Sequence, residues 1–290
     1  MFKKGLLKFL FLLLFAGVVY GEGESCQELG SILRGEASKT DKICDIFVPR
    51  NNIVSTLNGF VLQPGIGIGL EVTVIPIKGS QKKAFDGEIA LLENEIQETS
   101  IFLKNHGFNI IALHNHYLEE TPKIMFLHFE KQGNPLKIAQ QLRQLADMIG
   151  GFDSSTFPFT SSLDPNAINS ILKLNGGIKQ NGVYRADFQR PFKIDDNGAI
   201  SEPECMIAIE GTMNNALIVG EIAVKVNEMQ RFIKALLANG LLLTAVHNHE
   251  VSETPRVYYI HFEQFGLPAT VLAQAARNAL NTIHVEKEGQ

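Results

Sequence analysis

The sequence predicts an α+β protein, built as a tandem duplication of a mainly antiparallel sheet module with flanking helices, the two copies being related by a pseudo-twofold axis. One observation is that an unusual set of histidines, glutamates and prolines occurs twice, with matched residues 133 positions apart (247 − 114, 253 − 120, 261 − 128). The other is that each copy alternates runs of helix length with shorter apolar runs of strand length. A module of roughly 115 residues has the usual size of a single domain.

The repeat extends beyond this motif. The matched segments are His114-Asn115-His116 with His247-Asn248-His249, Glu120-Thr121-Pro122 with Glu253-Thr254-Pro255, and His128-Phe129-Glu130 with His261-Phe262-Glu263. The segment Gly87-Glu88-Ile89-Ala90 likewise returns as Gly220-Glu221-Ile222-Ala223. Further upstream the offset is 139, as between Ser31 and Ser170, which indicates a six-residue insertion (139 − 133) in the first copy near 78–83.

In the first copy, the pattern predicts strands near 43–48, 70–77 and 85–92. A helix over 94–106 and a strand over 108–116 follow, and Gly107 between them is typical of a helix end. The Glu120-Thr121-Pro122 segment breaks the pattern, and a further strand covers 123–130. Asn134-Pro135 then opens a helix to about 149, since Asn is a good cap and Pro suits the first helical position. Asn94-Glu95 and Asn227-Glu228 are interpreted as helix starts, where Asn caps the helix and Glu meets the positive end of its dipole.

The second copy repeats this order. It is predicted to contain a helix from Asp164-Pro165 to about 175, a helix over 227–239, strands over 241–249 and 256–263, and a helix over 268–283. A stretch rich in Ser, Thr, Pro and Phe separates the copies. The predicted division is therefore a signal peptide at 1–21, a first repeat module at 22–150, a linker at 151–163 and a second repeat module at 164–290.

The N-terminus has the pattern of a secretory signal peptide. Lysines precede an apolar run over 9–20, and polar residues follow Gly21. The run is shorter than the roughly 20 residues that a spanning helix needs, and no lipid-attachment box precedes Cys26. We therefore expect a periplasmic or secreted protein without a membrane span after cleavage at Gly21. In such a compartment disulfides persist, so Cys26 and Cys44 are expected to be bridged, and Cys205 to be a buried apolar residue.

The charge of the chain excludes one class of function. The formal net charge is −5, and no basic cluster occurs outside the predicted signal peptide. Nucleic acid is therefore not an expected partner. No nucleotide cofactor is expected either.

The histidines carry the main functional hypothesis. Residues i and i+2 of a strand share a face about 6–7 Å apart, so His114 and His116 point the same way, as do His128 and Glu130. They share one face only if the hairpin pairs in even register, with His114 roughly opposite His128. Imidazole nitrogens in this arrangement suit a transition metal, with Zn²⁺ or Cu²⁺ favoured over Cu⁺ because Met and Cys ligands are lacking. The candidate ligands are His114, His116, His128, Glu130, His247, His249, His261 and Glu263.

Each motif also has a purely structural interpretation. A His-x-His pair on a strand is usually an ordinary polar pair at a sheet surface, and Glu-Thr-Pro is often only a turn. The joint occurrence in both copies favours metal binding over a structural histidine hairpin. Glu120 and Glu253 are candidates for a further metal ligand, for a residue that hydrogen-bonds to a ligand side chain, or for a general base. One shared site at the pseudo-twofold and two separate sites both remain open.

The module resembles the LppY/LpqO family of exported bacterial proteins, whose domain has no known function. The resemblance rests on Ala112-Leu113-His114-Asn115-His116, Glu120-Thr121-Pro122 and His128-Phe129, with the same pattern in the second copy. It covers nearly all of the chain after the signal peptide. It implies the repeated unit and export, but no activity. Because this chain lacks a lipobox, the membrane anchor of the lipoprotein members is not carried over.

Three classes of function fit these features. The first is an exported cell-envelope protein that binds a transition metal, with an envelope protein or a small ligand as a further partner. The second is a metalloenzyme, either a hydrolase with Glu120 or Glu253 as base or a cupin-like enzyme. Cupins share the His-x-His-x₃-Glu spacing, but here no Pro-x-Gly motif with a fourth ligand follows. The third is a module that binds cell-wall polymer or protein without metal.

Overall fold

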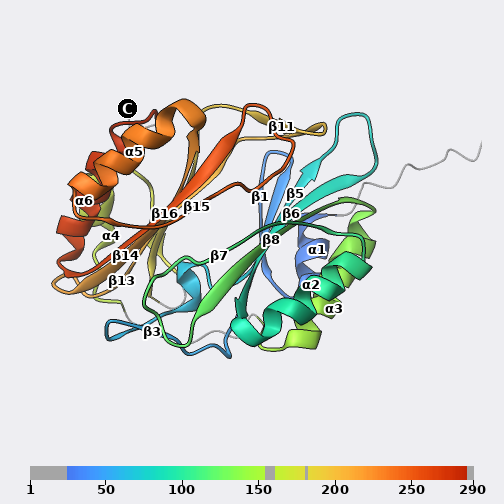
Figure 1. Ribbon diagram of the computed structural model, residues 1–290, viewed down its shortest axis with the longest axis horizontal. Coiled ribbons are helices and arrows are strands. Elements are labelled where there is room, and N and C mark those ends of the chain that lie inside the picture. Colours follow the sequence, from blue (N-terminus) through green and yellow to red (C-terminus); the bar gives the residue numbers. More distant parts are fainter. Residues whose placement is uncertain (1–24, 154–160, 180–181, 286–290) are drawn as a thin grey trace, which may run out of the picture.

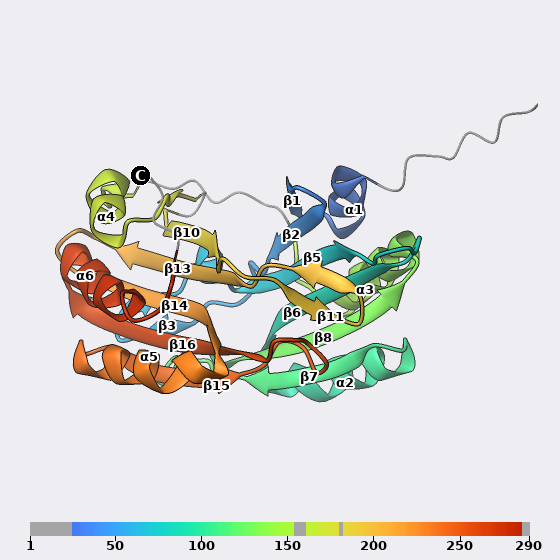
Figure 2. The same ribbon diagram turned by 90° about the horizontal axis from the view of Figure 1, so that it is seen from above.

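The computed structural model describes residues 25–153, 161–179 and 182–285. Within them, two six-stranded antiparallel sheets face each other, one from each copy, and the helices of each copy cover the outer side of its own sheet (Figure 1). Figure 2 shows the same two halves from above, joined along the middle of the molecule. The predicted fold class, a duplicated α+β module with mainly antiparallel sheet, is confirmed.

The first copy forms a sheet in the order β1-β2-β5-β6-β8-β7. Its elements are α1 (Cys26–Leu33), β1 (Glu36–Thr40), β2 (Ile43–Pro49), β3 (Thr56–Leu57), β4 (Phe60–Val61), η1 (Pro64–Ile66), β5 (Gly69–Pro76), β6 (Lys83–Leu92), η2 (Glu93–Glu95), α2 (Ile96–Asn105), β7 (Asn109–His114), β8 (Ile124–Gly133) and α3 (Pro135–Ile149).

The second copy forms the corresponding sheet in the order β15-β16-β14-β13-β10-β9. Its elements are α4 (Pro165–Leu172), β9 (Gly177–Ile178), β10 (Tyr184–Gln189), β11 (Ile194–Asp196), β12 (Ala199–Ser201), β13 (Glu204–Gly211), β14 (Ala216–Lys225), α5 (Val226–Ala238), β15 (Leu242–His247), β16 (Val257–Leu267) and α6 (Ala269–Leu280).

The predicted Asn cap is found at α3, but the predicted caps at Asn94 and Asn227 are wrong, because Asn94 lies inside η2 and Asn227 is the second residue of α5, after the cap position Lys225. The Asn134 side chain accepts a hydrogen bond from the backbone N–H of Lys137 at 3.0 Å, and α3 begins at the following proline. Glu95 accepts from the backbone N–H of Leu92 at 2.7 Å, in keeping with its interpretation as a helix-start residue. It also pairs with the guanidinium of the buried Arg50 at 2.6 Å. The same arrangement recurs in the second copy, where Glu228 pairs with Arg190 at 2.9 Å.

Two small hairpins reach across the pseudo-twofold, one from each copy. The loop after the β3–β4 hairpin contacts the second copy, where the N–H of Gln63 donates to Glu210 at 3.2 Å. The β11–β12 hairpin contacts the first copy, where Ile77 and Ala199 form a β-bridge. Each hairpin also bonds to the Glu-Thr-Pro turn of its own copy, through bridges between Thr56 and Thr121 and between Asp195 and Thr254. Through these contacts, the β3–β4 and β11–β12 hairpins hold the two inner sheet faces against each other.

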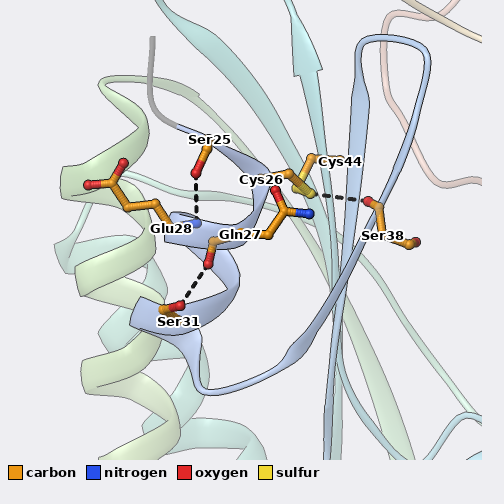
Figure 3. The surroundings of a disulfide bond; sticks show 7 residues. All are labelled: Ser25, Cys26, Gln27, Glu28, Ser31, Ser38 and Cys44. Carbon is orange, nitrogen blue, oxygen red and sulfur yellow. Dashed lines mark hydrogen bonds between the residues drawn. A yellow bond between two sulfur atoms is a disulfide. The ribbon is translucent and has the colours of Figure 1, made fainter. Parts of the chain in front are cut away.

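The predicted disulfide between Cys26 and Cys44 is present, and it ties α1 to β2 (Figure 3). Cys205 is free and buried, as expected, and burial raises the pKa of its thiol to about 12. The predicted signal peptide lies outside the described residues, as does most of the predicted linker. Among the described helices, none has the length and apolar character needed to cross a membrane.

Candidate metal centre

The β7–β8 and β15–β16 hairpins carry the histidines to the middle of the molecule. In the first hairpin, Ala112 lies opposite His128 and His114 opposite Phe126. The even register is therefore confirmed, although His114 sits two residues from the position directly opposite His128, beside a bulge between 110 and 112. The second hairpin has the same register, with His247 opposite Tyr259. All four strand histidines consequently point to the inner face of their sheet.

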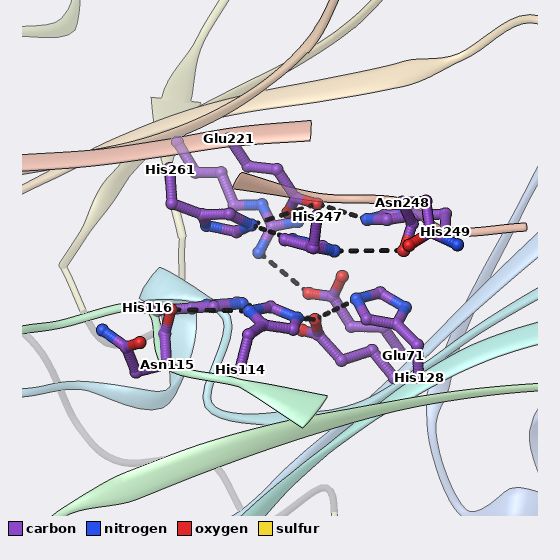
Figure 4. Close-up of polar contacts among 12 residues, drawn as sticks. Glu71, His114, Asn115, His116, His128, Glu221, His247, Asn248, His249 and His261 are labelled. Atoms are coloured by element: carbon purple, nitrogen blue, oxygen red, sulfur yellow. Dashed lines mark hydrogen bonds and ion pairs between the residues drawn. The ribbon is translucent and has the colours of Figure 1, made fainter. Parts of the chain in front are cut away.

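The six motif histidines form one cluster and not two (Figure 4). Each imidazole of the first copy lies against one of the second, stacked in two of the pairs and tilted by 37° in the pair His128–His249. The centroid separations are 3.6 Å for His114 and His247, 4.2 Å for His116 and His261, and 4.1 Å for His128 and His249. The two hairpins thus meet at the pseudo-twofold, and the cluster belongs to both copies.

Two glutamates complete this histidine cluster, one from the central strand of each sheet. In the first copy, three Nε2 atoms converge on one oxygen of Glu88, at 2.6 Å from His128, 3.2 Å from His116 and 3.4 Å from His114. In the second, Glu221 lies 2.7 Å from Nε2 of His249. Glu88 and His128 are direct cross-strand neighbours, so the β6–β8 pairing fixes their contact. Glu221 and His261 are cross-strand neighbours on β14 and β16, with Nε2 of His261 3.6 Å from the Glu221 carboxylate.

Some ring nitrogens of the cluster meet another imidazole nitrogen, and one has no partner at all. Nε2 of His247 lies 2.8 Å from Nε2 of His261, and Nδ1 of His128 has no hydrogen-bond partner although it is buried. Buried polar atoms are nearly always paired in native proteins. Such convergent nitrogens are what a metal site presents when its ligands are described without the ion.

Three overlapping groups in the described chain bring their ligand atoms within 4.8 Å of one another. The groups are His114 with His247 and His261, His128 with His247 and His249, and Glu88 with His114 and His128. The first two draw ligands from both copies, so neither copy alone supplies them. Any two of the three groups have one histidine in common.

Burial sets the protonation of these side chains. It lowers the pKa of His114 to about 4, and it lowers the pKa values of His247 and His261 well below the ordinary value. Burial by itself would raise the pKa of Glu88, but the charges of His116 and His128 together with hydrogen bonds hold it well below its usual range. At neutral pH the imidazoles of His114, His247 and His261 are therefore neutral, and the carboxylate of Glu88 is ionised.

The structure places three predicted ligands outside these groups: His116, whose Nε2 atom contacts Glu88 at 3.2 Å, and the two glutamates Glu130 and Glu263. Glu130 accepts a hydrogen bond from the side-chain amide of Asn109 at 3.1 Å. Glu263 accepts one from the backbone N–H of Leu118 at 3.3 Å, across the boundary between the copies. Both side chains lie on the same sheet face as the histidines, as the alternation predicted, but one strand repeat further from the centre.

Glu120 and Glu253 have a local partner in the turn that each begins. Glu120 accepts from the backbone N–H of Ile124 at 3.0 Å and pairs with Lys123 at 3.1 Å. Glu253 accepts from the backbone N–H of Val257 at 3.2 Å. Neither belongs to a group of clustered ligands in the described residues, and both side chains are completely buried. Their geometry matches the turn interpretation of the Glu-Thr-Pro segments.

Glu88 and Glu221 were not among the candidate residues, although the sequence held a signal for them. Both stand in the repeated Gly-Glu-Ile-Ala segment, where a glutamate lies among apolar residues at the matched position of both copies. The sequence predicts the strand but does not connect this glutamate to the histidines, because 26 to 40 residues separate Glu88 from His114 and His128 (114 − 88, 128 − 88).

A cavity of about 860 Å³ lies between the two sheets next to the histidine cluster. Glu88, Glu221, His128 and His249 line it, so it gives a small molecule or ion access to the centre. Across it, the guanidinium of Arg185 pairs with Glu71 at 3.2 Å, another contact between the copies. The fold and site together define a two-module protein with one histidine-rich centre shared by the modules.

Comparison with known families agrees with the internal duplication. Residues 27–148 and 166–282 each match the family described as Domain of Unknown Function (DUF1259), and the chain belongs to this family. No curated protein matches the chain.

Two solved structures are similar at a low level. A fused permuted hexameric shell protein from the RMM microcompartment is 14% identical, with 71% of this chain and 85% of that chain covered and a TM-score of 0.21. The trimeric bacterial microcompartment shell protein PduB is 12% identical, with 85% and 89% covered and a TM-score of 0.20. Similarity at these TM-scores supports no conclusion about fold or function.

Proposed function

We propose that this protein binds a transition metal ion at the shared histidine centre. The observation that carries the proposal is that groups of imidazole nitrogens from both copies converge within 4.8 Å of one another in a buried site. A metal ion would give nitrogens of both copies a common partner, whereas Glu88 forms ion pairs with the histidines of the first copy. Metal–nitrogen bonds of about 2.0–2.1 Å would draw these nitrogens closer to one another.

The donor set favours Zn²⁺ or Cu²⁺. Imidazole with one carboxylate suits both ions, and no cysteine belongs to the clustered groups of the described chain. Because any two of the three groups share a histidine, the groups as they stand hold one ion at a time. The two hairpin sites expected from the sequence are therefore better described as two halves of a single site.

An enzymatic role is a second candidate, supported by the cavity beside the centre. A zinc ion there would lower the pKa of a bound water to about 7. Glu88 or Glu221 would be the acid–base group in this case, since both contact the histidines and line the cavity. Glu120 and Glu253 are held in their turns and are less suited to that role.

The proposed location is the periplasm or the cell exterior. The signal-peptide pattern at 1–21 and the disulfide between Cys26 and Cys44 support it, since disulfides persist in oxidising compartments. The proposal includes kinship with the exported LppY/LpqO proteins, which this chain resembles. Sequencing the N-terminus of the exported chain tests the proposed export, and a start at Glu22 is expected.

Metal uptake by protein purified without a His-tag tests the main proposal. The metal-free chain should take up Zn²⁺ or Cu²⁺ at micromolar concentrations in equilibrium dialysis with elemental analysis. The His284→Ala variant is the matched control, because this histidine is exposed and lies outside the cluster. Uptake that is absent from the wild type, or that His284→Ala removes, contradicts the proposal and leaves a binding module without metal.

A further inference from the structure

A second, smaller cavity of about 280 Å³ lies beside the histidine centre and is strongly acidic. Its walls carry four carboxylates from four different segments: Asp86 on β6, Glu130 on β8, Asp196 on β11 and Glu250 after β15. The one basic residue in its lining, Lys131, directs its ammonium group to the backbone oxygen of His106 and to Gln141. Within the described chain, the acidic pocket therefore has no cation of its own.

The pseudo-twofold gives this acidic pocket a natural comparison. The positions of Asp86 and Glu250 correspond to Val219 and Tyr117 at the offset of 133 (219 − 86, 250 − 117). Asp196 corresponds to Leu57 at the offset of 139 (196 − 57). In the counterpart, Leu57, Tyr117 and Val219 pack together in one apolar cluster that fills the space.

Three of the four acidic positions are thus apolar or aromatic in the other copy, whereas Glu130 corresponds to a second glutamate, Glu263, at the offset of 133 (263 − 130). An apolar filling stabilises the fold at no electrostatic cost, whereas buried like charges repel each other and lose hydration. The acidic pocket therefore costs stability that the apolar cluster does not. A cation bound among the carboxylates would offset this cost.

Two of the carboxylates lack partners of their own. Glu250 is 7% exposed, lines both cavities, and makes no hydrogen bond or ion pair through its carboxylate in the described chain. One oxygen of Asp86 is buried without a hydrogen-bond partner. Buried carboxylates are ordinarily paired, so these oxygens point to a ligand.

We propose that the acidic pocket binds a small organic cation, an alkylammonium or diamine, next to the histidine centre. The carboxylates are spread around the cavity, and no three of them in the described chain bring oxygens within 4.8 Å of one another. They suit hydrogen bonds to a spread-out ammonium ligand better than direct ligation of a bare metal ion. Ile75, Ala84 and Ala199 form the apolar part of the wall, which suits an alkyl chain.

The acidic pocket communicates with the histidine centre. Asp86 and Glu250 line both the small cavity and the larger one, which His128 and His249 also line. A diamine bound at Glu250 would extend from the acidic pocket toward the histidine centre, where the two cavities adjoin. The binding step itself requires no metal, so it can be tested separately from the proposed metal function.

Titration calorimetry on the full-length exported chain, treated with chelator, tests the proposal with putrescine as the probe. One putrescine per chain should bind, and 1,4-butanediol, which has the same length but no charge, should not. The Glu250→Gln and Asp196→Asn variants should each weaken putrescine binding about tenfold or more, because each removes a charged acceptor. Glu119→Gln, the same change at an exposed glutamate outside the pocket, should leave it unchanged.

Three results would overturn the inference. The first is that the wild type does not bind putrescine. The second is that Glu250→Gln and Asp196→Asn bind putrescine as tightly as the wild type. The third is that Ca²⁺ or Mg²⁺ binds more tightly than putrescine, with the same sensitivity to these variants. The last result would assign the pocket to an inorganic cation. Asp196→Asn should retain Zn²⁺ uptake, so that loss of metal binding and loss of putrescine binding are told apart.

Discussion

The imidazole rings of His114 and His247 stack at 3.6 Å between centroids, although the residues lie 133 positions apart (247 − 114). They are the corresponding residues of the two copies, so the pseudo-twofold passes between them. Each also belongs to a group of clustered ligands that includes residues of the other copy. Duplication therefore built a site that neither module possesses alone.

The carboxylate at Glu88 should matter for metal affinity, and that at Glu120 should not. Glu88→Gln removes the charge on which three imidazoles converge, so we expect metal affinity to fall about 10–100-fold. Glu120→Gln makes the same chemical change in a turn and keeps an acceptor for the N–H of Ile124. Competition with a chromophoric chelator measures both. Equal losses in the two variants would contradict the assignment.

The disulfide should stabilise the chain by constraining its unfolded state. Cys26 and Cys44 are separated by 18 positions, for which loop closure gives about 3 kcal/mol. Reductant should lower the free energy of unfolding of the wild type by this amount, measured by urea denaturation, and should not affect the Cys26→Ala/Cys44→Ala variant. Alkylation of natively exported protein without reduction should modify at most Cys205. Two or three modified thiols would refute the bridge.

Glu210 should make the protein less stable as the solution becomes alkaline. Burial raises the pKa of this carboxyl from 4.5 to about 8, against a lowering hydrogen bond from the N–H of Gln63. The folded chain thus binds a proton that the unfolded chain releases between these values. The resulting stability is present below the unfolded pKa and is lost as pH rises through the folded pKa.

Replacing this carboxyl by an amide removes its titration. The free energy of unfolding of Glu210→Gln should therefore fall less between pH 5 and pH 8 than that of the wild type, in urea denaturation at each pH. Glu119→Gln, at an exposed position, should follow the wild type. Parallel curves for Glu210→Gln and the wild type would show that this carboxyl is not protonated in the folded chain.

Much of the fold could be predicted because its signals are local. The helix predicted from Asn134-Pro135 to about 149 is found at Pro135–Ile149, where the cap and the proline fix its start. The strand predicted over 108–116 ends earlier, at His114, because the chain bends there before His116. The β3–β4 and β11–β12 hairpins were not predicted, since strands of two or three residues carry no periodic pattern.

The candidate site could be predicted only in part. Strand alternation and even register put His114 and His128 on one face, and both follow from the period of a strand. The meeting of the two hairpins could not be predicted, because it depends on how the inner sheet faces and the β3–β4 and β11–β12 hairpins pack. Glu88 joins His128 through cross-strand pairing, which a single sequence does not display.

Metal stoichiometry in single histidine variants tests the shared centre most directly. Equilibrium dialysis against Zn²⁺ with elemental analysis should give one ion per wild-type chain. With the ion held by His114, His247 and His261, the one group that contains both substituted residues, His114→Ala and His247→Ala should each lose that ion, although they lie in different copies. Two ions per wild-type chain, with each substitution removing one, would show two separate sites and contradict a shared centre. Full uptake by both variants would contradict metal binding by these histidines altogether.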